Sequence, residues 1–213
     1  MAISIVDHEL PDYTHNLYDV TFYEKSISTI VTNTPSYVDS WIAEIERIHS
    51  RRLHCLIVGL DVEWRPNQSR YSDNPVATLQ LCVGARCLVF QILHSPTIPQ
   101  SLINFLRNPS YTFAGVGIES DLEKLTEDYN LVVANMADVR LLAADKYGVR
   151  ELRNSGLKIL AMRVLGKEIN KPKGITMSRW DNQWLTPAQV QYACIDAFLS
   201  FEIARILISG DRN

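Results

Sequence analysis

Paired and spaced carboxylates are the first chemical feature of this chain. Asp61 and Glu63 alternate along the segment GLDVEW, and a strand would direct both carboxylates to the same side of a sheet. Tyr192 and Asp196 stand four residues apart, so a helix would place the phenol and the carboxylate on one face. Asp121 lies between these pairs, after the apolar segment FAGVGI. Oxygen donors of this kind suit hard cations such as Mg²⁺ and Mn²⁺.

Each of these motifs also has an ordinary structural interpretation. A DxE pair can be a polar strand end, Asp121 can stabilise the first turn of a helix, and Tyr192 with Asp196 can form a structural pair. The four carboxylates together favour a functional site, because in one pocket they would repel one another unless divalent cations neutralise them. Two such ions about 3.5–4 Å apart form the arrangement that supports in-line displacement at a phosphodiester.

The three motifs, in this order and at this spacing, resemble the exonuclease motifs of the tyrosine subtype of the DEDD superfamily. The histidine subtype carries its histidine five residues before the last aspartate, where this chain has Gln191. More narrowly, the segments DVEW, LQLCVGARCLVFQI, AGVGIESD and LTPAQVQYACIDAF are similar to those of Werner-like exonucleases, including the stand-alone exonucleases of plants. The similarity covers about residues 56–207.

This resemblance implies an RNase H-like (DnaQ-like) α/β fold with a mixed sheet flanked by helices. It implies a divalent-metal-dependent 3′-to-5′ exonuclease that hydrolyses DNA and releases nucleoside 5′-monophosphates with two Mg²⁺ or Mn²⁺ ions. Asp61, Glu63 and Asp196 would hold the ion that activates water, and Asp61 would bridge to the second ion. Asp121 would hold that second ion through water. Tyr192 would orient the attacking water, because a phenol with a pKa of about 10 is a poor general base at neutral pH.

Two other functions are compatible with the same motifs. An RNase D-like 3′-to-5′ exoribonuclease shares the tyrosine subtype, and contact with a 2′-hydroxyl is not readable from the sequence. A catalytically silent nucleic-acid or protein-binding module on the same fold is less favoured, since all four acids and Tyr192 are present. The chain departs from the Werner exonuclease at Glu123, which stands where that family has a tryptophan and would not stack on a base.

Basic residues gather before the last motif. Residues 146–180 contain nine lysines and arginines against two acids, which favours either a polyanion-binding face or a solvated helical surface. We expect residues 171–184 to form a loop that guides phosphates to the site through Lys171, Lys173 and Arg179, with Trp180. Trp64, directly after the DxE pair, would either stack on the terminal nucleotide or pack in the core.

Hydrophobic periodicity predicts the elements that would position these residues. Apolar runs predict extended segments at 18–23, 28–32, 56–60 and 112–116, and an antiparallel hairpin from 76–83 and 86–92. Helical spacing predicts helices at 37–48, 100–106, 120–129, 139–147, 157–165 and 187–208. The predicted strands lie mainly in the first half of the chain and the predicted helices mainly in the second half. This order indicates an α/β or α+β domain with a mixed sheet.

Length and composition fit one ordinary globular domain over residues 1–213. The chain has 21 Lys and Arg against 24 Asp and Glu, a formal charge of −3, and 46% hydrophobic residues. No stretch predicts a membrane span or a secretory signal. We expect four reduced, buried thiols, at Cys55, Cys82, Cys87 and Cys194.

The expected partners and location follow from the resemblance. The expected substrate is DNA, most readily a duplex with a recessed 3′ end, with RNA as the alternative and no membrane partner. The similarity does not include a helicase, so a separate helicase or repair protein is an expected partner, and the sequence leaves the oligomeric state open. A nuclear location is expected from the family, with the cytoplasm as the alternative, and secretion is not expected.

Overall fold

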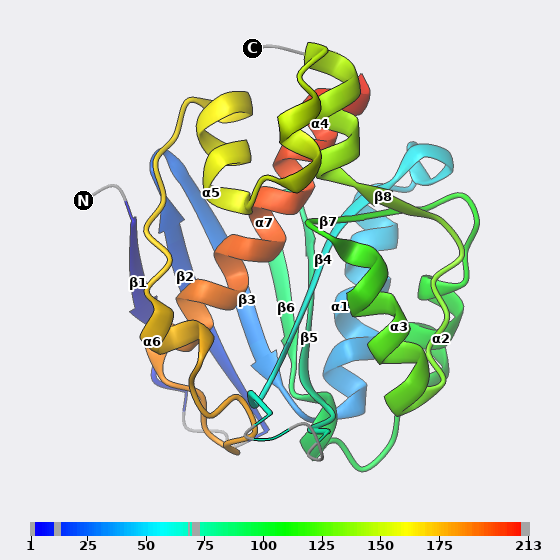
Figure 1. Ribbon diagram of the computed structural model, residues 1–213. Coiled ribbons are helices and arrows are strands. Elements are labelled where there is room, and N and C mark those ends of the chain that lie inside the picture. The colour runs from blue at the N-terminus through cyan, green and yellow to red at the C-terminus, as the bar shows by residue number, and fades with distance from the viewer. Residues whose placement is uncertain (1–2, 11–13, 68, 70–72, 210–213) are drawn as a thin grey trace.

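The protein contains an eight-stranded mixed β-sheet (Figure 1). The computed structural model describes residues 3–10, 14–67, 69 and 73–209, so the expected domain limits at residues 1 and 213 lie outside the described residues. The strands are β1 (Ile3–Asp7), β2 (His15–Phe22), β3 (Lys25–Thr32), β4 (Ile57–Trp64), β5 (Val76–Val83), β6 (Arg86–Phe90), β7 (Thr112–Gly115) and β8 (Met136–Asp138). Their order across the sheet is β1-β2-β3-β6-β5-β4-β7-β8.

The sheet combines antiparallel and parallel pairs. β1, β2 and β3 pair antiparallel, and so do β6, β5 and β4. β3 pairs parallel with β6, and β4, β7 and β8 pair parallel with one another. Parallel neighbours require long crossover connections, and helices supply them here. The mixed sheet and the β5–β6 hairpin predicted from the sequence are both confirmed.

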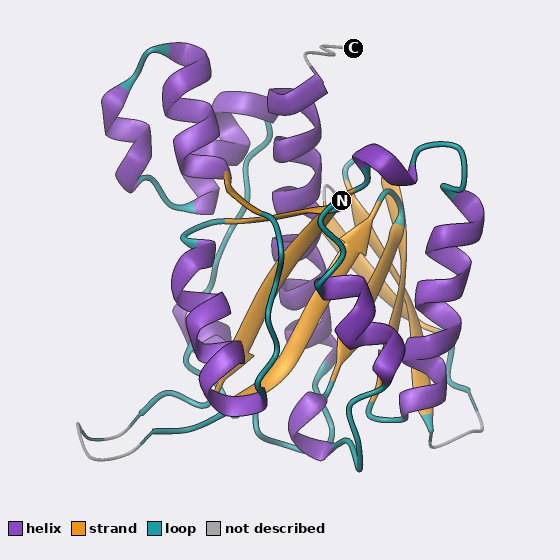
Figure 2. Cartoon of the chain, turned by 90° about the vertical axis from the view of Figure 1, so that its right-hand side faces the viewer, coloured by secondary structure: helices purple, strands orange, loops and turns teal. Residues whose placement is uncertain are grey.

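Helices cover both faces of the sheet (Figure 2). They are α1 (Pro35–Ile48), α2 (Gln100–Leu106), α3 (Ile118–Tyr129), α4 (Val139–Tyr147), α5 (Leu157–Leu160), α6 (Lys173–Thr176) and α7 (Pro187–Ser209). Short 3₁₀ turns lie at Leu53–Cys55, Ile92–His94 and Arg150–Asn154, and α5 continues into a π-helical turn at Ala161–Leu165. One core lies under α1, α2 and α3, and the other lies under α4, α5 and α7. Within the described ranges, no helix is both long and apolar enough to span a bilayer.

Strand β4 has one apolar face and one face that carries the acids. Val58 and Leu60 are fully buried in the core beneath α1, α2 and α3. Because side chains alternate along a strand, Gly59, Asp61 and Glu63 share the opposite face. Helix α7 covers that face of the sheet. Both carboxylates therefore point toward this helix.

Gly59 allows α7 to approach β4 closely. A Cβ atom at this position would lie 2.0 Å from the carbonyl oxygen of Ala197 and 2.7 Å from the backbone nitrogen of Phe201. Helix α7 is buried along most of its length, as expected of a helix that is apolar on nearly all sides. The strand and the helix that carry the acids are therefore in backbone contact.

The sequence does not predict three short elements. β1 and β8 are edge strands, and α6 is a single helical turn inside the expected loop 171–184, so that segment is not wholly irregular. β8 has three residues, too few to show an alternation pattern. The four cysteines are free, but the expectation that all are buried is wrong for Cys55, which is exposed in a 3₁₀ turn.

We expect Gly59→Ala to destabilise the protein by about 3 kcal/mol or more, because the added methyl group would overlap the backbone of α7. Gly174→Ala is the matched control, since a Cβ atom there meets nothing within 4 Å. Denaturant unfolding of both variants measures the difference. If Gly59→Ala unfolded at the same denaturant concentration as the wild type, the close contact would not be required for the fold.

Candidate active site

Three carboxylates from β4 and α7 meet at one point. Asp61 and Glu63 come from β4, and Asp196 comes from α7. Each of the three side chains offers a carboxylate oxygen, and these oxygens all lie within 4.8 Å of one another. The convergence expected from the spacing of the motifs is present for these residues, which we call the acidic triad.

Asp196 is buried, and Asp61 and Glu63 are partly buried. Burial raises the pKa of Asp61 well above its usual range, and the charge of Asp196 raises it further. Burial and the charge of Asp196 also raise the pKa of Glu63 to about 8, although Lys171 opposes the rise. The Oδ2 atom of Asp61 is buried and has no hydrogen-bond partner among the described residues. A buried carboxylate oxygen without a partner is costly, and a bound cation would remove that cost.

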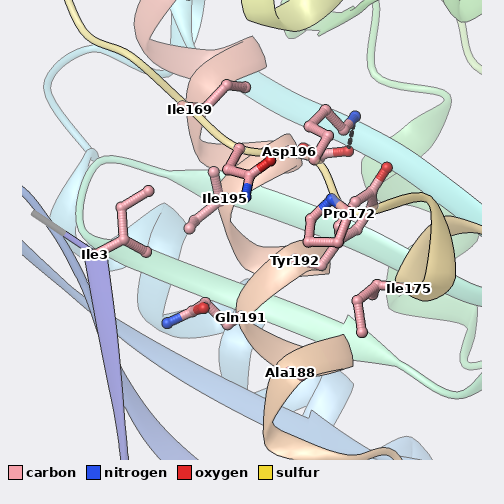
Figure 3. Close-up of a pocket in the computed structure, with 11 residues that line it drawn as sticks. Ile3, Ile169, Pro172, Ile175, Ala188, Gln191, Tyr192, Ile195 and Asp196 are labelled. Atoms are coloured by element: carbon pink, nitrogen blue, oxygen red, sulfur yellow. Dashed lines mark hydrogen bonds and ion pairs between the residues drawn. The ribbon is translucent and has the colours of Figure 1, made fainter.

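Lys171 forms an ion pair with one member of the triad. Its ammonium group donates to Oδ2 of Asp196 and lies 4.8 Å from the centre of the Tyr192 ring. Figure 3 marks this contact with a dashed line at Asp196. Burial raises the pKa of Asp196, and the charge of Lys171 opposes that rise. Burial alone would lower the pKa of Lys171, but the Asp196 carboxylate outweighs it and the net shift is upward.

Tyr192 lies one helical turn before Asp196 on the same helix. Its hydroxyl accepts a hydrogen bond of 3.1 Å from the Thr176 hydroxyl, and its ring centre is 6.0 Å from that of Trp180. Burial raises the pKa of the phenol to about 12, and the charge of Asp196 adds to the rise. The phenol is therefore neutral at physiological pH, where it can orient a water molecule but is not a base.

Asp121 stands beside the acidic triad. It lies in the first turn of α3, which follows Gly117 in a left-handed conformation with a φ of 67°. It does not belong to the group of oxygens within 4.8 Å, although its charge raises the pKa of Asp61. Burial raises the pKa of Asp121 itself to about 7, against the opposing charge of Arg140.

Arg140 is a charged residue near the site that the sequence analysis does not select. Asp138 holds its guanidinium, with Nε 3.1 Å and Nη2 2.7 Å from Oδ2. A Cβ atom on Gly117 would meet this guanidinium at 3.0 Å, so Arg140 lies against the turn that precedes Asp121. The only sequence signal is Asp-x-Arg at a helix start, and Asp138 also serves there as an ordinary N-cap.

The other predicted substrate-contact residues lie in different environments. Trp64 is half-buried, and the ammonium group of Lys124 lies 5.5 Å from its ring centre. Lys173 is exposed at the start of α6. Arg179 forms an ion pair of 2.7 Å with Asp181 in the segment before α7. Among the described residues, none of these three side chains forms a hydrogen bond or ion pair with the acidic triad.

The prediction that Trp180 contacts substrate is wrong. Its exposed fraction is 0%, and its indole N–H donates to the backbone oxygen of Thr176 at 3.3 Å. The indole ring is buried and packs beside the Tyr192 ring, so it helps to hold Tyr192 in place. Glu123 is exposed on α3, where it cannot replace the stacking surface of a tryptophan.

Helix α7 presents Tyr192 rather than Gln191 to the acidic triad. Figure 3 shows Gln191 directed toward Ile3 on β1 and away from Asp196. Both Gln191 and Ile3 line a cavity of about 220 Å³ that extends from the triad toward the sheet edge. The position that carries histidine in the other DEDD subtype therefore has no contact with the acids here.

Comparison with known proteins identifies the family. Residues 31–209 match the family described as 3′-5′ exonuclease, and the chain belongs to that family. A 3′-5′ exonuclease of Arabidopsis thaliana is 36% identical over 152 residues, which cover 70% of this chain and 52% of that protein. The bifunctional 3′-5′ exonuclease/ATP-dependent helicase WRN of Mus musculus is 37% identical over 143 residues, which cover 67% of this chain and 10% of that protein. The resemblance to Werner-like exonucleases is thereby confirmed.

A solved structure confirms the expected RNase H-like fold. RNase D of Escherichia coli, described as an exoribonuclease involved in structured RNA processing, superposes with a TM-score of 0.68 at 21% identity. The superposition covers 84% of this chain and 44% of that chain, and at this identity it establishes the fold alone. The chain spans about half the length of the plant relative and about a tenth of the mouse relative.

We expect the metal-free protein to lose stability as the pH rises from about 5 to about 8. In this window folded Glu63 keeps its proton, whereas an unfolded glutamate, with a pKa of about 4.3, has released it. Folding then takes up a proton, so the free energy of unfolding falls as the pH rises. Thermal unfolding in EDTA across this range measures the decline.

Glu63→Gln should reduce that decline, because the amide does not titrate. Glu127→Gln is the matched control, since Glu127 is exposed on α3, away from the triad. The control should follow the wild type. A decline in Glu63→Gln as steep as that of the wild type would contradict the assignment of the effect to this carboxylate.

Proposed function

We propose that this protein is a divalent-metal-dependent 3′-to-5′ exonuclease that hydrolyses DNA and releases nucleoside 5′-monophosphates. One observation carries the proposal: three carboxylates lie within 4.8 Å of one another, and one of their oxygens, Oδ2 of Asp61, is buried without a partner. One buried and two partly buried acids at this distance repel one another, and a cation bound between them would offset that repulsion. Membership of the 3′-5′ exonuclease family supports the same reaction.

The donor set fits Mg²⁺ or Mn²⁺, because every candidate ligand is a carboxylate oxygen. We propose that Asp61, Glu63 and Asp196 hold one ion and that Asp61 also bridges to a second. Asp121 lies outside the triad, and its charge raises the pKa of Asp61. We propose that it holds the second ion through water. Bound there, the ions would supply Lewis-acid charge at the scissile phosphate.

The chain's own residues would position the reactants around that phosphate. The Tyr192 hydroxyl, held by Thr176 at 3.1 Å, can fix the orientation of the attacking water. Lys173 and Arg179 would contact the phosphates of the strand, because exposed basic side chains beside an active site attract a polyanion. Trp64 has a partly accessible ring that can stack on the terminal base.

DNA is the proposed substrate because the chain is 36–37% identical to a plant 3′-5′ exonuclease and to a mouse WRN exonuclease/helicase, which the sequence resemblance also singles out. By the same relationship we propose a nuclear location and a separate helicase or repair protein as partner, since the mouse relative carries a helicase in the same chain. The fold shared with RNase D makes RNA the alternative substrate that a direct test must include.

We expect metal-dependent digestion of a 5′-labelled DNA duplex with a recessed 3′ end, in Mg²⁺ or Mn²⁺ and not in EDTA. Asp61→Ala should lower the rate more than about a hundredfold, because it removes the proposed shared ligand. Asp145→Ala is the matched control, since that aspartate pairs with Arg153 on the surface. Single-stranded RNA of equal length is digested in parallel.

The outcomes of this experiment separate the candidates. A ladder on DNA that disappears with Asp61→Ala supports the proposal. A ladder on RNA alone would replace DNA by RNA as the substrate. Strong Mg²⁺-dependent activity in Asp61→Ala would remove this residue from the mechanism, and binding without hydrolysis of either strand would favour a silent binding module.

Tyr192→Phe should slow turnover about tenfold to a hundredfold and change the affinity for DNA much less, because the hydroxyl orients water and the ring packing is retained. Single-turnover rates and DNA binding in the absence of divalent ions measure the two quantities. An unchanged single-turnover rate would exclude the hydroxyl from the reaction. Thr176→Val tests the hydrogen bond that holds it and should give a smaller effect in the same direction.

A further inference from the structure

One cation of the protein already occupies part of the acidic site. Among the described residues, Lys171 is the only lysine or arginine that forms an ion pair with a member of the triad. Its partner, the Asp196 side chain, is 7% exposed, whereas the lysine side chain is 30% exposed. The lysine therefore reaches from a partly exposed segment to the buried member of the triad.

The lysine contacts more than one component of the site. Its ammonium group donates to Oδ2 of Asp196 and lies 4.8 Å from the ring centre of Tyr192. Asp196 is also one of the three acids whose oxygens lie within 4.8 Å of one another. A divalent ion held by these oxygens would compete directly with the ammonium group for Asp196, because both are cations that need the same carboxylate.

Lys171 has room and freedom to leave this position. It lies between Ile169 and α6, on the wall of the cavity of about 220 Å³ that separates this segment from α7. Most of the other lining side chains are apolar, including Ile3, Pro172 and Ile175, and Figure 3 shows them around the cavity. A lysine carries a point charge on a flexible four-carbon stem, so it can change partners without movement of the backbone.

We propose that Lys171 is an exchangeable counter-ion: it neutralises Asp196 in the metal-free protein, gives up that carboxylate when a divalent ion binds, and then faces the phosphate of the substrate. The proposal rests on the proposed function, because it requires that the acidic triad bind metal. It assigns to Lys171 a role in metal binding that can be measured without nucleic acid. Lys171 is thus a positioning residue of the metal site as well as a phosphate contact.

The first experiment measures the affinity of the metal-free protein for Mn²⁺ by calorimetry, with no nucleic acid present. Lys171→Met should bind Mn²⁺ on the order of tenfold more tightly than the wild type, because the competing cation is gone. Lys171→Arg keeps a cation and should remain close to the wild type. An equal or weaker affinity in Lys171→Met would overturn the proposal, while the metal site itself would stand.

Lys167→Met is the matched control. Lys167 also contacts one carboxylate and one tyrosine, with Glu24 at 3.1 Å and the Tyr23 ring centre at 4.2 Å, but it lies away from the triad. Its loss should leave the Mn²⁺ affinity within about twofold of the wild type. A comparable gain in this variant would overturn the proposal, because the effect would then come from net charge alone.

A second measurement uses the unmodified protein, so it does not depend on the folding of a variant. Acetylation of lysines by a water-soluble amine reagent is followed by peptide mass spectrometry with and without saturating Mn²⁺. Lys171 should react several-fold faster with Mn²⁺, whereas Lys167 should not change. An equal rate of acetylation of Lys171 with and without Mn²⁺ would overturn the proposal that the lysine exchanges with the metal ion. Failure of the wild type to bind any Mn²⁺ would instead overturn the proposed function, and this inference with it.

Discussion

The backbone contact between β4 and α7 at Gly59 determines the geometry of the site. Asp61 lies two residues after this contact on the strand, and Asp196 directly precedes Ala197, whose carbonyl oxygen faces Gly59. Because no side chain separates the two backbones, short carboxylates can meet across the gap. A side chain at Gly59 would push the helix outward and increase the distances from Asp196 to Asp61 and Glu63. The cores on both faces of the sheet hold the strand and the helix at this separation.

The same contact concentrates negative charge where there is little solvent. Burial raises the pKa of Asp61, Glu63 and Asp196, so the metal-free site resists ionisation. Such a cluster lowers stability, and the extensive apolar core on either side of β4 makes that loss tolerable. The clustered acids therefore destabilise the fold locally. Acids with pKa values raised in this way are typical of functional sites.

The sequence predicts the parts of this site that depend on local periodicity. Asp61 and Glu63 share a face because strands alternate, and Tyr192 and Asp196 share a face because helices repeat every 3.6 residues. Long-range packing decides the rest. Nothing local distinguishes a tryptophan that stacks on a nucleotide from Trp180, which is buried under its own segment. The contact of Arg140 with Gly117 likewise depends on how α3 and α4 pack against the sheet. The sequences of the two helices do not predict this packing.

The two cations near the acids differ in how they are held, and this difference makes the site asymmetric. Arg140 is fixed by a two-pronged contact with Asp138 where β8 passes into α4, so the charge beside Asp121 is permanent. Lys171 stands on a flexible stem in a segment with a single helical turn, and it contacts the triad itself. In the proposed function the site takes up a charged strand and releases a charged product in every cycle, so its charge balance changes. Of these two cations, Lys171 is the one that we propose to move, so the exchange of charge would take place between α7 and the segment that precedes it.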